Sequence, residues 1–409
     1  MANKLKETRV LTWNDLSMAE LTVLETAFWS SHTSRHALAG LLGYSKSKAN
    51  ATVAALIERG LLQEAGQQPS SGGRQPEALR LSERLGVVAG IDLGATSVDV
   101  ALMAPDLSIR AHHAEPIDVR AGPGVVLPRV RAVLRELLGQ LNLTTRHVMG
   151  IGMGVPGPVA FDQGMLVAPP LMPLWDGFSI RDDFRREYAA PVFVDNDVNL
   201  MALAEQWRLR RQLPDFLVIK VGTGVGCGIV CHGQVHRGAT GSAGDVGHIC
   251  VDQQGPLCHC GNRGCVEAMA AGPAIARLAE EAARAGTSAL LAQWLARDGQ
   301  LSPEHVAQAS RQGDATASAI VQRAGGLIGQ MLASVVNFFN PSHVFIGGGI
   351  TNIGPLFLAA VRQSVYQRSL ALSTRHLDIQ FSPLGAHTGV TGAGVLAMQE
   401  TLRTRGVAP

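Results

Sequence analysis

The sequence predicts an α/β protein in which a small helical segment precedes a larger body of alternating strands and helices. Over the first 60 residues, apolar side chains recur at helical spacing, and two short strands follow before residue 82. From Gly86 onward, apolar strands end in Gly-rich turns and alternate with Ala-rich helices. Of the 409 residues, 46% are hydrophobic and 17% are charged, which indicates compact domains without long disordered tails.

Three helices are expected in the N-terminal segment. The first covers residues 14–30, where leucines and Phe28 fall on one face. Ser34 is a good N-cap for a second helix that stops at Gly43, and Ser45 caps a third helix that ends at Gly60. Two short helices joined by a Gly-containing turn, the second of them amphipathic, predict a helix-turn-helix.

The first turns of the third helix carry polar side chains that suit DNA recognition. A recognition helix presents this region to base edges and phosphates in the major groove. The alternative is a solvated face on a small helical adaptor. Residues 1–84 hold 10 Lys/Arg against 8 Asp/Glu, so the net charge of +2 lies in this segment and adds weak support for DNA binding. The expected contact residues are Ser45, Lys46, Ser47, Lys48 and Asn50.

Two short strands, Leu61–Glu64 and Ala78–Leu81, flank a Gly/Pro-rich stretch and predict a hairpin, or wing. The tip of this wing contains Arg74. An arginine on a flexible tip suits the narrow minor groove, where the negative potential is concentrated. The alternative is an ordinary linker to the body. A helix-turn-helix, a wing and a basic tip together favour DNA binding.

Several Gly-rich turns in the body suit the binding of a nucleotide. Small residues and exposed amides in such turns can hold a phosphate, and a neighbouring carboxylate can orient Mg²⁺. Two such loops on two lobes predict a two-lobed actin-like (ribonuclease H-like) fold, although each loop alone reads equally as a plain hairpin. The candidate nucleotide-binding residues are Asp92, Gly94 and Thr96 in the first loop, Gly222, Thr223 and Gly224 in the second, and Gly348 near the C-terminal end.

A strand runs directly into a helix at residues 191–205, and four polar residues lie at the junction. A carboxylate beside an amide at a strand end is placed to bind sugar hydroxyls, and a single Asp there can also act as general base on the hydroxyl that attacks a γ-phosphate. The alternative is helix capping, a role that Asp and Asn commonly fill. We expect one of the four residues to cap the helix.

The segment from Asp245 to Glu267 predicts a metal site. It contains His248, Cys258, Cys260 and Cys265, four N/S ligands at close spacing with no open position, and this is typical of structural zinc. His259 competes as a ligand by position, but we expect its side chain to point away from the neighbouring cysteines. The alternative is free or disulfide-bonded thiols, which six irregularly spaced cysteines make less favourable.

The pattern GHxxxxxxxxxCxCGxxGCxE resembles the zinc motif of the ROK family, which groups sugar kinases with sugar-responsive transcriptional repressors. The resemblance covers essentially the whole chain, including the N-terminal winged helix of the repressors. It implies that Asn196, Asp197, His248 and Glu267 contact a sugar, with Asp197 the catalytic base in kinases. Kinases of the family usually carry Glu where this chain has Asp245, so this sugar contact is lost, bridged by water or tuned to another sugar.

The sequence therefore predicts three domains: a winged helix-turn-helix over residues 1–82, a first actin-like lobe over 83–200 with 384–409, and a second lobe over 201–383 that holds the zinc loop and an oligomer interface. The expected function is a cytoplasmic, sugar-responsive regulator of carbohydrate genes, most commonly a repressor. The alternative is an ATP-dependent sugar kinase that phosphorylates a hexose or N-acetylhexosamine at position 6, or both activities in one chain.

The expected partners follow from these readings. They are operator DNA, a sugar or sugar-phosphate effector, and a second copy of the chain in a homodimer or tetramer, because helix-turn-helix readers need two half-sites. A phosphotransferase-system protein is an alternative signal. Structural Zn²⁺ is the expected cofactor, with ATP and Mg²⁺ only if kinase activity is retained. No membrane partner is expected, because the first residues are polar and charged.

Overall fold

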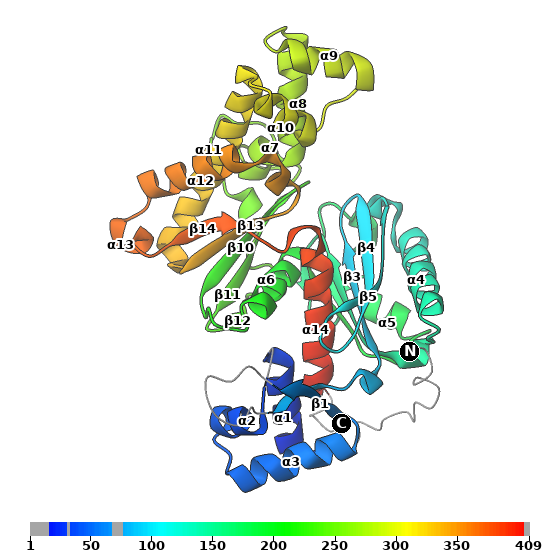
Figure 1. Ribbon diagram of the computed structural model, residues 1–409. Helices are drawn as coiled ribbons and strands as arrows, with labels where there is room; N and C mark the ends of the chain where they lie inside the picture. The colour runs from blue at the N-terminus through cyan, green and yellow to red at the C-terminus, as the bar shows by residue number, and fades with distance from the viewer. Residues whose placement is uncertain (1–15, 31–32, 68–76, 405–409) are drawn as a thin grey trace. The chain divides into compact units, whose positions relative to one another are not determined.

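The computed structural model describes residues 16–30, 33–67 and 77–404 (Figure 1). The chain forms two compact units. Unit 1 consists of Met1–Gln212 and Gly389–Pro409, and unit 2 consists of Leu213–Thr388. Each unit is built around its own five-stranded sheet. The expected division into three domains stays a prediction.

Unit 1 begins with the helix-turn-helix and its two-stranded sheet. Ser34 and Ser45 cap the second and third helices as expected, accepting hydrogen bonds from the amides of Ala37 and Lys48 at 3.2 Å each. Gly43 ends the second helix in the left-handed conformation, with φ of +64°. The elements are α1 (Met18–Trp29), α2 (Arg35–Leu42), α3 (Lys46–Glu58), β1 (Leu62–Gln67) and β2 (Glu77–Leu81).

The wing is an antiparallel pair in which Leu62 lies opposite Leu81 and Glu64 opposite Leu79. These strands fall where the sequence predicts them. The tip with Arg74 lies outside the described residues. The first helix begins later than expected, because Ser17 and Glu20 form a capping box that fixes its start at Met18.

The larger sheet of unit 1 has the strand order β5-β4-β3-β6-β9. Its first three strands are antiparallel, and β6 and β9 are parallel to β3. Because strand side chains alternate between faces, Ala89 and Ile91 of β3 pack in the core with α4, whereas Gly90 faces the backbone of α14. The elements are β3 (Val87–Leu93), β4 (Ser97–Met103), β5 (Ile109–Pro116), α4 (Pro123–Gln140), β6 (Val148–Val155), β7 (Val159–Ala160), β8 (Met165–Leu166), α5 (Ile180–Phe184), β9 (Val192–Asn196), α6 (Asp197–Arg208) and α14 (Thr388–Thr404).

The sheet of unit 2 repeats the same topology in the order β12-β11-β10-β13-β14, with three antiparallel and two further parallel strands. This pair of similar mixed sheets is the actin-like arrangement that the sequence predicts. The elements are β10 (Phe216–Val221), β11 (Val225–Cys231), β12 (Gln234–Val235), α7 (Val266–Ala270), α8 (Gly272–Arg284), α9 (Ala289–Asp298), α10 (Pro303–Arg311), α11 (Ala315–Phe339), β13 (His343–Gly347), α12 (Pro355–Arg368), α13 (Ala371–Thr374) and β14 (Asp378–Phe381).

In the described part of the chain, α11 is long and apolar enough to cross a membrane by length and composition. It is instead a core helix of unit 2, since 56% of its apolar window is buried. Gly325 and Gly329 let α12 approach closely, because a Cβ at either position would lie 2.6 Å from a backbone oxygen of α12.

Candidate functional site

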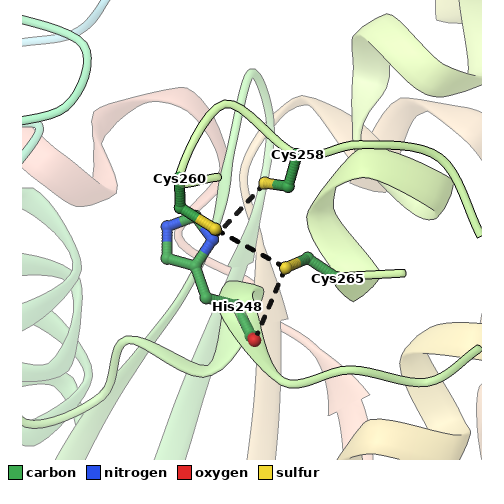
Figure 2. Close-up of side chains that lie close together, drawn as sticks. All are labelled: His248, Cys258, Cys260 and Cys265. Carbon is green, nitrogen blue, oxygen red and sulfur yellow. Dashed lines mark hydrogen bonds between the residues drawn. The ribbon is translucent and has the colours of Figure 1, made fainter. Parts of the chain in front are cut away.

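The zinc loop of unit 2 brings its four expected ligands together (Figure 2). His248 ends a short 3-10 helix, Val246–His248, and Cys265 directly precedes α7. His248 Nδ1 lies 3.6 Å from Cys258 Sγ, and Cys260 Sγ lies 3.7 Å from Cys265 Sγ. All four donor atoms lie within 4.8 Å of one another.

These separations suit a tetrahedral ion. A Zn–S bond of 2.3 Å gives an edge of about 3.8 Å between two sulfurs, and about 3.6 Å between a sulfur and an imidazole nitrogen. The loop reaches this shape through glycines. Gly261 and Gly264 have φ of +90° and +70°, and a Cβ on Gly264 would overlap the carbonyl oxygen of Asp252. All six cysteines lie in the described residues and are free of disulfides.

The thiols of this cluster differ in acidity. Burial raises the pKa of Cys265 to about 12, and burial also raises the pKa of Cys258. The backbone amide of Asn262 lowers the pKa of Cys260. A cation is therefore needed to hold all three as thiolates near neutral pH, and its binding would release protons.

The two histidines of the loop both turn Nδ1 toward Cys258 and differ in the carboxylate that Nε2 meets. His248 turns Nδ1 toward Cys258, and its Nε2 lies 3.7 Å from Oδ1 of Asp245. His259 is not one of the four clustered ligands. Its Nδ1 nevertheless lies 4.0 Å from Cys258 Sγ, so the side chain does not point away from both neighbouring cysteines as the sequence predicts. Its Nε2 lies 3.1 Å from Oε1 of Glu267, so this imidazole is engaged with the glutamate that follows the zinc loop.

Glu267 connects the zinc loop to the second Gly-rich loop within unit 2. It lies buried in the first turn of α7, and its Oε2 accepts a hydrogen bond from the Val225 amide at 2.8 Å. A Cβ on Gly224 would lie 2.5 Å from that same oxygen, whereas a Cβ on Gly222 would meet only Lys220 Cε at 4.0 Å. The glycine at 224 therefore makes room for the carboxylate. Thr223, between them, is exposed.

In unit 1, the ends of three adjacent strands place the other polar candidates in one row. Asp92 of β3 pairs with Gly154 of β6, which in turn pairs with Asp195 of β9. A Cβ on Gly154 would lie 3.3 Å from Asp92 Oδ1 and 3.5 Å from Asp197 Cα, so the two carboxylate residues flank this glycine. Gly94 closes the first turn with an amide bond to the Ser97 carbonyl at 2.8 Å. In the same turn, Thr96 O accepts from the Ile117 amide.

Asn196 is the residue that caps α6. Its Oδ1 accepts from the Val198 amide, and its Nδ2 donates to the Gly157 carbonyl, both at 2.9 Å. Asp197 follows in the first turn and is only 8% exposed. The positive end of the helix dipole favours a carboxylate there. The capping role that the sequence leaves open for one of the four junction residues thus belongs to Asn196.

Packing within unit 2 explains why a glycine stands at position 348. Its φ is +87°, and a Cβ there would lie 2.5 Å from the Val221 carbonyl at the end of β10. Close packing within unit 2 therefore already requires glycine at this position. A nucleotide contact at Gly348 stays a prediction.

The expected DNA-contact residues lie on the exposed side of α3. Ser45, Lys46, Ser47, Lys48 and Asn50 are exposed, and Ala49 between them is buried. Arg35 and His36 of α2, which the sequence does not single out, line a hollow together with Lys46 and Asn50. Recognising that the first turns of α2 and α3 come together would have identified them. Arg35 is also paired with Glu64 at 2.8 Å.

The family model described as "ROK family" matches residues 88–400. The chain belongs to the ROK family. A xylose repressor of Caldicellulosiruptor bescii is 28% identical to this ROK protein over 385 residues, covering 94% of this chain and 96% of the relative. A glucokinase of Halalkalibacterium halodurans is 31% identical over 313 residues, covering 76% and 94%.

Among solved structures, this ROK protein is similar to a ROK family transcriptional regulator that is a homolog of the Escherichia coli Mlc protein. The TM-score is 0.78 at 25% identity, with 95% of this chain and 98% of that chain covered. The regulators match nearly the whole chain, whereas the glucokinase leaves about a quarter of it unmatched. The protein is thus a transcriptional regulator of the ROK family, with the N-terminal segment that its regulators possess.

Proposed function

We propose that this protein is a sugar-responsive repressor of carbohydrate-metabolism genes that acts in the cytoplasm on operator DNA. The observation that carries the proposal is a capped helix-turn-helix with a two-stranded wing preceding a ROK body. A body of this family by itself serves glucokinases such as the relative described above. The additional N-terminal segment, with its helix-turn-helix and wing, supplies the DNA-binding element that a regulator requires.

The DNA contacts are assigned to α3. Its N-terminal residues Lys46, Ser47, Lys48 and Asn50 are exposed, and we assign them to a major groove. Lys48 Nζ lies 3.8 Å from the centre of the Tyr44 ring and would exchange this contact for the DNA. Arg35, beside Lys46 in the hollow, adds a guanidinium for a backbone phosphate. Ser45 is occupied as the helix cap, so its contribution is to present the α3 amides. Arg74 of the wing tip is assigned to the minor groove.

The effector is a monosaccharide or its phosphate. In unit 1 we assign it to Asn196 and Asp197, and in unit 2 to Glu267, Asp245 and His248. Glu267 and Asp197 are both buried carboxylates held at helix starts, which is the kind of fixed acceptor that sugar hydroxyls need. The relatives are named for a pentose and a hexose, so both classes of sugar belong in the test.

Zn²⁺ is the metal that the His/Cys₃ donor set suits best. Held by His248, Cys258, Cys260 and Cys265, it would fix the loop that leads into α7 and so the start of the helix that carries Glu267. The role is structural, because the four ligands leave no open position.

Kinase activity is the second candidate. It is favoured by the buried Asp197, a candidate general base, and by Asp92 on the other side of Gly154. ATP and Mg²⁺ would be its cofactors, with Gly94, Thr96, Gly222, Thr223, Gly224 and Gly348 near the nucleotide. ATP turnover with hexoses and N-acetylhexosamines, compared between the wild type and Asp197→Ala, tests it. A bifunctional chain would retain both turnover and operator binding.

We further propose a homodimer or tetramer, because one helix-turn-helix reads only a half-site. Unit 2 has an exposed apolar surface to which we assign the second copy. Phe338 is 91% exposed, Leu372 79%, Leu370 68% and Tyr366 47%. The solution mass of wild type and Phe338→Ser decides this. If Phe338→Ser is still a dimer, the interface lies on another surface. If the wild type is a monomer, a phosphotransferase-system protein is the better candidate partner for this surface.

The experiment for the main proposal is fluorescence anisotropy with duplexes that tile the chain's own upstream region, at several salt concentrations. We expect one duplex to bind specifically and to be released by one sugar. Lys46→Ala should weaken binding and reduce the slope of log K against log salt by about 1, whereas the matched surface change Arg186→Ala should not. Salt-insensitive binding, or equal loss in both variants, would contradict the assignment to α3.

A further inference from the structure

Aromatic residues connect the helix-turn-helix to the body of unit 1. Phe28 and Trp29 end α1, and both are buried. Phe28 stacks on Trp207 in the last turn of α6, with ring centroids 4.4 Å apart and an interplanar angle of 28°. Trp29 meets Trp207 edge-on at 5.7 Å. With Arg210, whose guanidinium lies 4.1 Å from the centre of the Trp207 ring, and with Arg211 and Gln399, described below, these residues are called the joint.

Arg211 ties three helices to this joint. Its guanidinium lies 3.7 Å from the centre of the Trp29 ring, a cation–π arrangement. One Nη donates to Oε1 of Gln399 on α14 at 3.3 Å, and the other lies 3.6 Å from Oε1 of Glu25 on α1. Burial lowers the pKa of this guanidinium. The side chain of Arg211 thus contacts α1 and α14, and its backbone amide donates to the Gln206 carbonyl in the last turn of α6.

The helix α6 links the joint to the proposed effector residues. It begins at Asp197, and Trp207 lies ten residues later, about 15 Å along a helix axis. Every residue from Asp197 to Gln206 is buried. A helix packed on all sides moves as one body, because interiors are too densely packed to bend locally. A displacement of its first turn therefore reaches its last turn.

The helix α14 runs beside α6 and also reaches the joint (Figure 1). A Cβ on Gly389, in its first turn, would overlap the carboxylate of Asp92. A Cβ on Gly392 would overlap the backbone of Leu200 on α6, so the two helices are in direct backbone contact. Further along α14, Gln399 accepts from Arg211.

The joint itself is not an optimised core. Arg210 and Arg211 are consecutive non-glycine residues in the left-handed region, with φ of +50° and +59°. Within the described residues, Trp29 Nε1, Arg210 Nη1 and Arg211 Nε are buried without a hydrogen-bond partner. A contact that retains strain and unmet hydrogen bonds exchanges easily for another arrangement, which a binding event can select.

We propose that α6, with α14 packed against its backbone, carries effector occupancy from Asp197 to the helix-turn-helix through this joint. The inference rests on the proposed function and adds the route by which effector binding reaches the DNA-binding helices. Binding at the start of α6 shifts this helix and its neighbour α14. The contacts of Trp207 and Gln399 with α1 and Arg211 then change, and operator affinity changes with them. The coupling is reciprocal, so operator DNA also changes effector affinity.

The test measures coupling rather than binding. In the wild type, saturating effector should change operator affinity within the range of about 5- to 150-fold that is common for such linkage. In Arg211→Ala and Trp207→Phe, operator and effector affinities measured singly should stay within about threefold of wild type, while the coupling falls below about threefold. Arg185→Ala, an exposed arginine of the same unit, is the matched control. Unchanged coupling in both joint variants would overturn the route.

A second readout does not depend on any ligand. Hydrogen exchange of the free protein should become faster in the first turn of α6, Val198–Met201, when Arg211→Ala loosens the joint, and Arg185→Ala should leave it unchanged. Exchange that rises only beside residue 211 would overturn the proposal. If exchange responds at the far end but no sugar releases DNA from the wild type, the proposed function fails and the mechanical connection stands. Arg211→Lys, which keeps the charge but not the planar stack, replaces Arg211→Ala if the latter unfolds.

Discussion

Replacing Gly224 with alanine should displace Glu267 and so separate the second Gly-rich loop from the start of α7. The new Cβ would lie 2.5 Å from Glu267 Oε2, where ordinary contact begins at 3.4 Å. The carboxylate oxygen would therefore have to retreat by about 0.9 Å, the difference between these two distances. The Val225 amide, now 2.8 Å from that oxygen, would then be out of hydrogen-bond range.

The cost follows from the loss of this bond. A hydrogen bond to a charged group contributes about 1.5–3 kcal/mol, and a buried amide left without a partner costs a similar amount. We expect unit 2 to lose about 2 kcal/mol of unfolding free energy, which lowers Tm by roughly 4–8 °C for a body of this size. Because the retreating carboxylate is also a proposed effector group, effector affinity should fall by tenfold or more, the equivalent of about 1.4 kcal/mol.

The assay is thermal unfolding with and without the effector sugar, followed by calorimetric titration. Gly222→Ala is the matched control, because its Cβ would meet only the flexible end of Lys220 at 4.0 Å. It should leave both Tm and effector affinity close to wild type. Equal behaviour of the two variants, or an unchanged Tm in Gly224→Ala, would refute the claim that Gly224 exists to accommodate Glu267.

Three further predictions concern unit 2. Removing zinc with a chelator, or replacing Cys258 with serine, should lower Tm by more than 5 °C, because metal binding adds to the folding free energy, and zinc should restore only the wild type. Zinc affinity should fall as pH decreases from 8 to 6, because protons compete with the metal for the cysteine thiols, and burial raises the pKa of Cys265 to about 12. Competition with a coloured chelator at several pH values measures this affinity. An affinity that does not change with pH would contradict the prediction. Gly348→Ala should lower the free energy of unfolding by about 2–4 kcal/mol, measured by urea unfolding without any nucleotide, because it combines a positive φ with a Cβ 2.5 Å from the Val221 carbonyl oxygen. Gly349→Ala, with open space around its Cβ, is the control and should leave the unfolding free energy close to wild type.

Apart from the actin-like fold class, the features that the sequence predicts correctly are local ones. Ser34, Ser45 and Gly43 act within one helical turn, and their capping roles follow from side-chain chemistry alone. The four zinc-loop residues are likewise close in sequence, so donor type and spacing are enough to group them. The residue roles that no geometry tests, such as the sugar contact at Asp245, stay predictions.

The joint could not be predicted in the same way. Trp207 reads as an ordinary packing residue, and nothing near it in sequence indicates that its partner is Phe28. Contacts between residues far apart in the chain depend on how whole elements pack, which periodicity does not specify. The capping box of Ser17 and Glu20 was a different kind of miss, because its signal is present in the sequence and fixes the start of α1.

The path of the chain through unit 1 has a consequence for its synthesis. Gly152 of β6 and Gly90 of β3 lie against the backbone of α14, so this face of the sheet is completed by a helix that leaves the ribosome after all of unit 2. Gln399, which holds Arg211, arrives with it. A nascent chain can therefore fold its helix-turn-helix long before the body that would control it is finished. Chains that stall before α14 should appear in the cell as unregulated or misfolded products and become substrates for proteolysis.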